Sequence, residues 1–95
     1  MPKAYLMAHI RVQDKEKFEE FKAASGPVIA DYGGRILVRN PSPDHREGDL
    51  RGVVTLIEFD DMDAARRFYT SPEYTAAKAI RELAADTDLL LVEGL

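Results

Sequence analysis

The sequence predicts an α+β domain with the ferredoxin-like order β-α-β-β-α-β, in which an antiparallel four-stranded sheet carries its helices on one face. Two observations support this prediction. Four short segments have the alternating or β-branched pattern of strands. Two longer regions, one after the first strand and one after the third, begin with capping residues and repeat apolar side chains at helical spacing. The 95 residues are the length of one domain, so we assign residues 1–95 to a single domain.

The first strand and the first helix are the most regular part of the pattern. In residues 3–12 apolar and polar side chains alternate with the two-residue period of a half-buried strand. Asp14 then supplies an N-cap for a helix that extends to Tyr32. Because proline removes a backbone donor, we expect a kink or a break at Gly26-Pro27. The glycine pair at 33–34 ends the helix.

A strand, a polar loop and another strand follow. Residues 35–39 (RILVR) and 53–59 (VVTLIEF) are apolar and β-branched, as strands are. Residues 40–52 between them are polar and rich in proline and glycine, which indicates a hairpin loop.

The second helical region has two starts. Asp60 or Asp61 caps a helix that runs to about Tyr69. The helix restarts at residues 71–73 (SPE), because serine is a favoured N-cap and proline fits the first helical position. It continues to about residue 84, followed by a fourth strand at 89–93 (LLLVE). The apolar residues expected to be buried on this helix are Ala77, Ile80, Leu83 and Ala84.

This order leaves one face of the sheet without helices, an area on the order of 400 Å² for four strands. The residues expected on the helix-covered face are Ala4, Leu6, Ala8, Ile10, Val12, Ile36, Val38, Val53, Thr55, Ile57, Phe59, Leu90 and Val92. The residues expected on the open face are Tyr5, Met7, His9, Arg11, Arg35, Leu37, Arg39, Val54, Leu56, Glu58, Leu89, Leu91 and Glu93. That face is too apolar for an ordinary wet surface and too charged for a core. We therefore expect a homodimer in which a two-fold related copy covers it and encloses a small-molecule pocket.

Charge and composition exclude several classes of function. The net charge is −4 and the basic residues form no run, which excludes nucleic acid as a partner. There is no cysteine, so disulfides and thiolate metal sites are excluded. No segment has the pattern of a signal peptide or the roughly 20 apolar residues of a membrane span. We expect a cytoplasmic protein without a membrane partner.

The candidate site residues lie on the expected open face. His9 is the candidate catalytic residue, because an imidazole titrates near neutrality and can accept or donate a proton. Its alternative role is a hydrogen-bonded residue at the dimer interface. Arg39 is the candidate to grip a carboxylate or enolate; its alternative is an ion pair with Glu58 or Glu93, or exposure to solvent. The other candidates for substrate binding are Tyr5, Arg11, Glu58 and Glu93.

The sequence predicts neither a metal site nor a bound cofactor. His45 lies in an acidic loop, DHREGD, but no second histidine or cysteine lies nearby, so a solvated loop is favoured over a metal site. Gly33-Gly34 precedes a strand, whereas a phosphate-binding loop follows one.

Four segments together resemble the domain-of-unknown-function 1330 family: GGRILVR (33–39), IEF (57–59), Phe68-Tyr69 with SPEY (71–74), and LLLVEG (89–94). The resemblance covers almost the whole chain, although Leu50 stands where an aromatic residue is expected. It implies a small bacterial protein of the dimeric α/β-barrel superfamily, which includes cofactor-free monooxygenases, muconolactone isomerases, haem-binding chlorite dismutases and stress-induced proteins. It supplies no reaction and no catalytic residue for this chain.

Three hypotheses of function follow. The first is a cofactor-independent enzyme, monooxygenase-like or isomerase-like, that acts on a small anionic or aromatic metabolite in a pocket between helices and sheet or between paired sheets. The second is a non-catalytic, stress-related dimer that binds a small molecule. The third is a pocket filled by the protein's own side chains.

Overall fold

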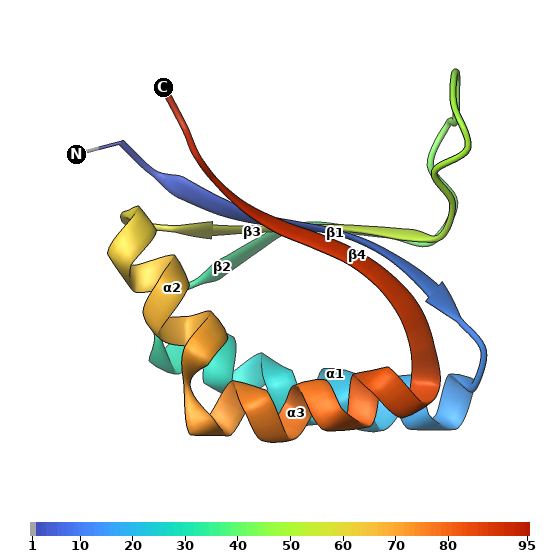
Figure 1. The fold of residues 1–95 in the computed structure, drawn as a ribbon, viewed down its shortest axis with the longest axis horizontal. Helices are drawn as coiled ribbons and strands as arrows, with labels where there is room; N and C mark the ends of the chain where they lie inside the picture. Colours follow the sequence, from blue (N-terminus) through green and yellow to red (C-terminus); the bar gives the residue numbers. More distant parts are fainter. Residues whose placement is uncertain (1) are drawn as a thin grey trace.

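The computed structural model describes residues 2–95, and its three helices all lie on one face of a four-stranded antiparallel sheet (Figure 1). The elements in chain order are β1 (Ala4–Val12), α1 (Lys15–Asp31), β2 (Arg35–Asn40), β3 (Val53–Phe59), α2 (Met62–Thr70), α3 (Pro72–Ala84) and β4 (Ala85–Glu93). The strands are arranged in the order β2-β3-β1-β4. This arrangement confirms the predicted ferredoxin-like order and the division of the second helical region.

Each helix begins at the residue that the sequence indicates. The backbone N–H of Lys17 donates to the side chain of Asp14 at 3.1 Å, and that of Ala64 donates to Asp61 at 2.8 Å. The N–H of Tyr74 donates to the Ser71 hydroxyl at 3.0 Å. These side chains satisfy donors that a helix leaves unpaired at its start.

The break expected at Pro27 does not occur, and α1 is continuous through that residue. Pro27 itself is exposed, while Ser25 and Ile29 on either side of it are buried. Packing against the sheet therefore holds the helix together despite one missing backbone hydrogen bond.

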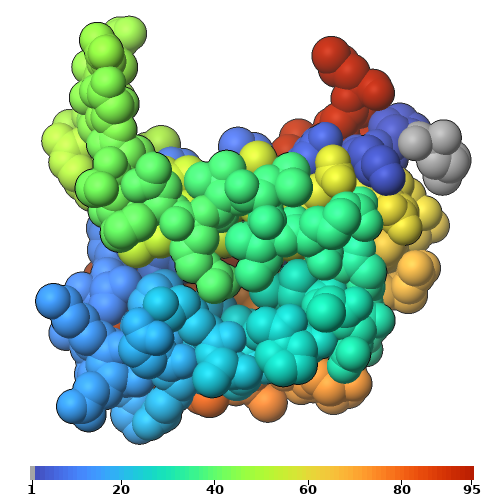
Figure 2. All heavy atoms as spheres, turned by 180° about the vertical axis from the view of Figure 1, so that it is seen from behind, coloured from blue at the N-terminus to red at the C-terminus, as the bar shows by residue number. Residues whose placement is uncertain are grey.

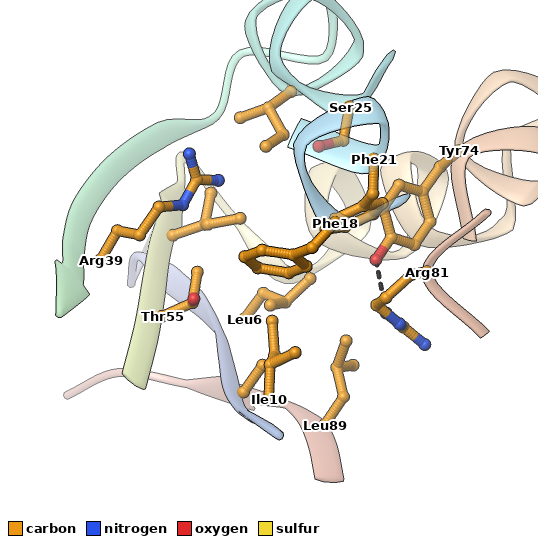
Figure 3. Close-up of a pocket in the computed structure, with 13 residues that line it drawn as sticks. Leu6, Ile10, Phe18, Phe21, Ser25, Arg39, Thr55, Tyr74, Arg81 and Leu89 are labelled. Atoms are coloured by element: carbon orange, nitrogen blue, oxygen red, sulfur yellow. Dashed lines mark hydrogen bonds between the residues drawn. The ribbon is translucent and has the colours of Figure 1, made fainter. Parts of the chain in front are cut away.

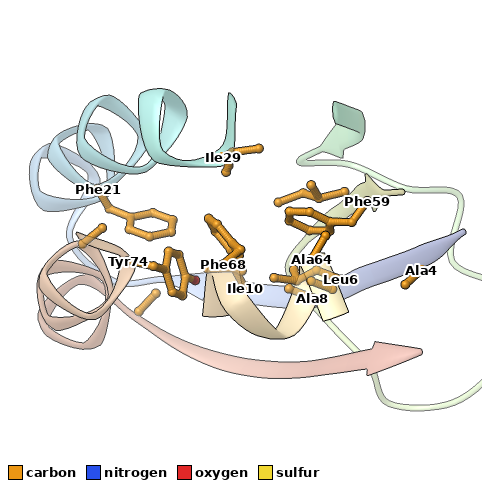
Figure 4. Packing of buried hydrophobic residues seen from close by; sticks show 14 of the residues in the cluster. Ala4, Leu6, Ala8, Ile10, Phe21, Ile29, Phe59, Ala64, Phe68 and Tyr74 are labelled. Carbon is orange, nitrogen blue, oxygen red and sulfur yellow. The ribbon is translucent and has the colours of Figure 1, made fainter. Parts of the chain in front are cut away.

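The core lies between the sheet and the helices (Figure 4). Alternate residues of β1, from Ala4 to Ile10, are at most 4% exposed and face the helices, as predicted. Aromatic rings pack above them: the Phe68 ring centroid lies 5.2 Å from that of Phe59 and 4.4 Å from that of Tyr74. Burying these large side chains supplies most of the stability of such a small domain.

Two strands differ from the predicted facing. A β-bulge between Ile36 and Val38 places one extra residue in β2. Beyond it, Val38 pairs with Leu56 on the open face and Arg39 pairs with Thr55 on the helix face. Both predictions for these two residues were wrong, because a bulge reverses the alternation of the residues that follow it.

In β4 the predicted facing is also reversed. This strand begins at Ala85, four residues earlier than predicted, and it is apolar in both phases. Leu89, Leu91 and Glu93 pair with Ala8, Leu6 and Ala4, which places them on the helix face. Leu90 and Val92 therefore lie on the open face, where they are 54% and 39% exposed.

The loop of residues 41–52 stands away from the sheet on the side opposite the helices (Figure 1). Seen from behind, the loop and the end of the chain rise at opposite ends of the open sheet face (Figure 2). The open face is thus the floor of a trough. None of the helices within residues 2–95 is long and apolar enough to cross a membrane.

Candidate functional site

A small cavity lies between the helix face of the sheet and helices α1 and α3 (Figure 3). Its volume is about 20 Å³, which is room for about one water molecule. A larger ligand therefore enters only if lining side chains move. The apolar lining residues are Leu6, Ala8, Ile10, Phe18, Phe21, Ile29, Ile57 and Leu89. The polar lining residues, which we call the donor set, are Ser25, Arg39, Thr55, Tyr74 and Arg81.

Arg81 is a buried cation without a carboxylate partner. Its side chain comes from α3, the residue is 6% exposed, and its Nη1 donates to the hydroxyl oxygen of Tyr74 at 2.7 Å. Its guanidinium also lies over the ring of Phe21, 6.0 Å from the centroid. Within residues 2–95 no acidic side chain forms an ion pair with it. Arg81 also lines a surface pocket with Glu82 and Asp86, so acidic side chains lie on its outer side, while its buried Nε has no partner and is available to an anion.

Arg39 joins the same cavity from β2. The bulge turns its side chain to the helix face, beside Thr55 of β3. Arg39 as a residue is exposed, but partial burial of its guanidinium lowers the pKa below its ordinary value, and the charge of Glu19 offsets this only in part. In the part of the chain that the structure describes, Arg39 forms neither an ion pair nor a side-chain hydrogen bond. It is therefore a second guanidinium that is free to bind an anion.

Three further donors in the cavity have no partner within residues 2–95. They are the hydroxyls of Ser25 and Thr55 and the Nε of Arg81. Buried polar atoms in folded proteins are normally hydrogen-bonded, so three unpaired donors around one cavity indicate that a hydrogen-bond acceptor binds there. No carboxylate and no imidazole lies among the residues that line the cavity. The lining therefore suits a ligand that accepts hydrogen bonds and carries negative charge.

Tyr74 is neutral in this setting. Burial raises the pKa of its phenol above the ordinary value, and the positive charge of Arg81 opposes the increase only in part. The hydroxyl of Tyr74 is therefore a hydrogen-bond donor at physiological pH and does not act as a tyrosinate base.

The predicted pair of His9 and Arg39 is separated by the sheet. His9 pairs with Val54 and Asp88 and lies on the open face, next to Leu50 of the projecting loop. Arg39 lies on the helix face. One small ligand cannot touch both residues of the same chain. The structure therefore does not bring His9 and Arg39 into one pocket.

The remaining predicted residues also divide between the faces. Tyr5 donates to Glu58 at 3.3 Å on the open face, and Arg35 Nε donates to the same carboxylate at 2.9 Å. Lys3 and Arg35 together hold the pKa of Asp60 below its usual value through hydrogen bonds.

Arg11 pairs with Asp88 at 3.1 Å on the open face. Glu93 lies on the helix face near Asp61 and Arg66, apart from the other candidates. Of the six predicted site residues, only Arg39 lines the cavity that holds the donor set.

Four residues of the donor set were not among the predicted site residues, although Tyr74 had been considered as a hydroxyl donor of a pocket. Tyr74, Ala77, Arg81 and Ala84 form one buried stripe on α3, whereas Leu83, which we expected to be buried, is 73% exposed. A charged residue at the two-turn spacing of a buried stripe is the signal that would have identified Arg81. Ser25 and Thr55 carry no comparable signal, because small hydroxyl residues are common in any core.

The fold and the cavity define a small ferredoxin-like α+β protein with a donor-lined cleft between helices and sheet. The chain belongs to the family described as "Domain of unknown function (DUF1330)", whose model matches residues 3–95. A search of curated proteins finds no match.

Solved structures share the fold at low sequence identity. A protein of unknown function from Rhodopseudomonas palustris has a TM-score of 0.81 at 18% identity, covering 99% of this chain and 83% of that one. The cofactor-independent oxygenase SnoaB from Streptomyces nogalater has a TM-score of 0.70 at 17% identity, covering 100% and 95%. A dimeric ferredoxin-like protein of unknown function from Jannaschia sp. has a TM-score of 0.76 at 12% identity, covering 97% and 99%. At these identities the likeness concerns the fold alone.

Proposed function

We propose that this chain is a cofactor-independent enzyme that acts on a small organic anion bound in the donor-lined cleft. One observation carries the proposal: two guanidinium groups, those of Arg39 and Arg81, line an apolar cavity that has no carboxylate in its lining. A bound anion supplies the missing counter-charge and accepts hydrogen bonds from the orphaned donors.

The same donors stabilise an oxyanion that forms during a reaction. In an apolar, water-poor cavity, fixed donors aimed at developing negative charge have a much larger effect than in water. Arg81 and Tyr74 are held by packing and by their mutual hydrogen bond, so they need little reorganisation. A substrate that loses a proton to give an enolate or phenolate is the kind that such a site favours.

The cleft contains no general base among its lining residues. The proton therefore leaves to water at the Arg39 side, or the substrate binds already ionised. An isomerase returns the proton at another carbon of the enolate, and an oxygenase lets the same anion react with molecular oxygen. Both reaction classes begin with the oxyanion that the donor set stabilises. The oxygenase SnoaB, which has the same fold, offers a precedent for chemistry without a cofactor.

Entry to the cleft requires Arg39 to move. Its strand, β2, is the edge strand next to β3, and every residue of β2 is exposed. Arg39 is therefore the lining residue whose side chain can swing outwards with the least loss of packing. In this proposal it both admits the ligand and binds it.

Exchange of carbon-bound protons tests the enzyme proposal. The protein is incubated in D₂O with 2-oxobutanoate, 4-oxopentanoate or phenylpyruvate, and deuterium incorporation is followed by NMR. We expect catalysed exchange for at least one compound in the wild type and a loss of at least tenfold in Arg39→Gln. Arg35→Gln is the matched control, because Arg35 lies on the same strand but pairs with Glu58 outside the cleft.

The outcomes separate the hypotheses. Saturable binding without exchange supports the non-catalytic binding protein instead. If none of the three compounds binds, measured as a shift in melting temperature, the cleft is not an anion site and the proposal is overturned.

We also propose that two copies pair through the open sheet face. Its exposed apolar side chains include Met7, Val38, Leu90 and Val92, between 37% and 54% exposed. The sheet face offers on the order of 400 Å², whereas a stable interface takes about 800 Å² from each partner. The projecting loop 41–52 supplies additional area at the edge of the trough (Figure 2). Similar structures from Jannaschia sp. and Bacteroides fragilis are described as dimeric.

A further inference from the structure

The donor set is divided between two ends of one cavity. Arg39 and Thr55 come from the paired strands β2 and β3, whereas Tyr74 and Arg81 come from α3. Figure 3 shows the first pair on one side of the Phe18 ring and the second pair on the other. Each end therefore has one guanidinium and one hydroxyl.

The segment between the two ends is apolar. Leu6, Ile10, Phe18 and Leu89 line it, and none of them donates a hydrogen bond. The cavity itself holds about one water molecule, so a larger ligand fits only when these side chains move apart; it then meets donors at its two ends and hydrocarbon in the middle.

The Arg81 end has unused donor capacity. Because Nη1 of Arg81 donates to the Tyr74 oxygen, the phenol proton must point to a different acceptor, and none is found within residues 2–95. The Nε of Arg81 also has no partner. Two donors at one buried end match the two oxygens of a carboxylate or the single oxygen of an enolate.

The Arg39 end is similar but closer to solvent. The hydroxyl of Thr55 has no partner, and the Arg39 guanidinium has none either. The two cations together have no acidic counterpart in the lining, so a ligand with two negative charges can pair with one guanidinium at each end.

Resting on the proposed function, we propose that the substrate class is a short-chain dianion: a carboxylate held by Arg39 and Thr55, joined through an apolar linker to a second carboxylate or an enolate held by Arg81 and Tyr74. The carboxylate held by Arg39 positions the molecule. The negative charge of the group at the other end is stabilised by the fixed donors of Arg81 and Tyr74.

A matched ligand series tests this assignment. Binding of succinate, glutarate, adipate and pimelate is compared with that of butanoate, pentanoate, hexanoate and heptanoate by titration calorimetry at constant ionic strength. We expect one dicarboxylate to bind at least tenfold more tightly than the monocarboxylate of the same length. The preference should disappear in Arg39→Gln and in Arg81→Met, and Arg35→Gln should retain it.

A second variant guards against a folding defect at the buried position. Circular dichroism checks that Arg81→Met is folded; Tyr74→Phe, which keeps the aromatic packing, should reduce the dicarboxylate preference severalfold. If mono- and dicarboxylates bind equally and Arg39→Gln weakens both, the dianion assignment is wrong while the anion site stands. If neither series binds, the proposed function fails with it.

Discussion

Arg81 and Tyr74 lie two helical turns apart on α3, and together they show how a buried charge is tolerated. The guanidinium lies over the Phe21 ring and donates to the phenol, so part of its lost hydration is replaced. The remaining Nε–H has no partner within residues 2–95. A protein that needed only packing here would gain from an apolar side chain of similar volume. The arginine is consistent with the proposed ligand, which would use the unpaired Nε–H.

The phenol of Tyr74 predicts a specific dependence of stability on pH. Burial raises its pKa in the folded chain above the ordinary value of 10.0. The folded state thus holds this proton more tightly than the unfolded state, and the stability that results is complete below pH 10 or so. It is lost as the pH rises from the unfolded pKa through the folded pKa.

We therefore expect the free energy of unfolding to fall more steeply above about pH 10 in the wild type than in Tyr74→Phe. Urea unfolding of both proteins at a series of pH values between about 8 and 11 measures the two free energies of unfolding. Their difference at each pH isolates Tyr74, because the other titrating groups are the same in both proteins. Parallel curves for the two proteins would show that the phenol ionises as easily in the folded chain as in the unfolded one.

At the scale of single residues, the sequence predicted which polar residues lie within the strands better than it predicted the face of the sheet that each one occupies. His9, Arg39 and Arg11 were correctly identified as polar residues within apolar strands. Which face Arg39 occupies depends on a bulge that no periodicity reveals. The hydroxyl of Thr55 indicated a binding site only once the structure showed that it has no hydrogen-bond partner within residues 2–95.

At the scale of elements, the prediction succeeded wherever local chemistry determines the boundary. The caps Asp14, Asp61 and Ser71 begin helices, and β3 spans the predicted residues 53–59. The prediction failed where contacts between residues distant in the sequence determine the boundary of an element. Residues 85–88 (ADTD) contain two aspartates and no large apolar residue, yet they extend β4 because they pair with residues 9–12 of β1.

The glycine in the middle of α1 leads to a prediction about this element. Gly26 is helical, and a Cβ added there meets no atom within 4 Å apart from its chain neighbours and the backbone of its own helix. We expect Gly26→Ala to raise the free energy of unfolding by up to about 0.5–1 kcal/mol, because alanine loses less backbone entropy on folding; the ring of Pro27 reduces this gain, since it disfavours helical geometry in a preceding residue that has a Cβ. Thermal unfolding should show an increase of several degrees.

A second glycine serves as the contrasting control. Gly52 has φ +108°, and a Cβ there would collide with the carbonyl oxygen of Ile10. Gly52→Ala should therefore destabilise the protein, since the strained backbone and the clash both act on the folded state. Should Gly26→Ala lower the melting temperature, the expected gain would be refuted, and the clash of the new Cβ with the Pro27 ring would outweigh the entropy difference.

At the scale of the whole molecule, the two faces of the sheet have different tasks. The helix face holds the core and the donor-lined cleft. The open face carries exposed apolar residues between ion pairs, Arg11 with Asp88 towards one end and Arg35 with Glu58 towards the other. A second copy on this face leaves the cleft open, because β2 and its Arg39 lie at the edge of the sheet. Pairing and ligand entry are therefore compatible.

The proposed dimer predicts a clear difference between two leucine substitutions. Leu90 is 54% exposed on the open face, and Leu83 is 73% exposed on α3. Leu90→Asp places an unpaired carboxylate in the proposed interface, where its desolvation costs several kcal/mol, so the dimer dissociation constant should rise at least about 100-fold. Leu83→Asp should leave it unchanged. Sedimentation velocity across a concentration series measures both constants, with circular dichroism as a check that each variant is folded. A wild type that sediments as a monomer at micromolar concentration, or equal weakening by both substitutions, would mean that the open face is not where two copies meet.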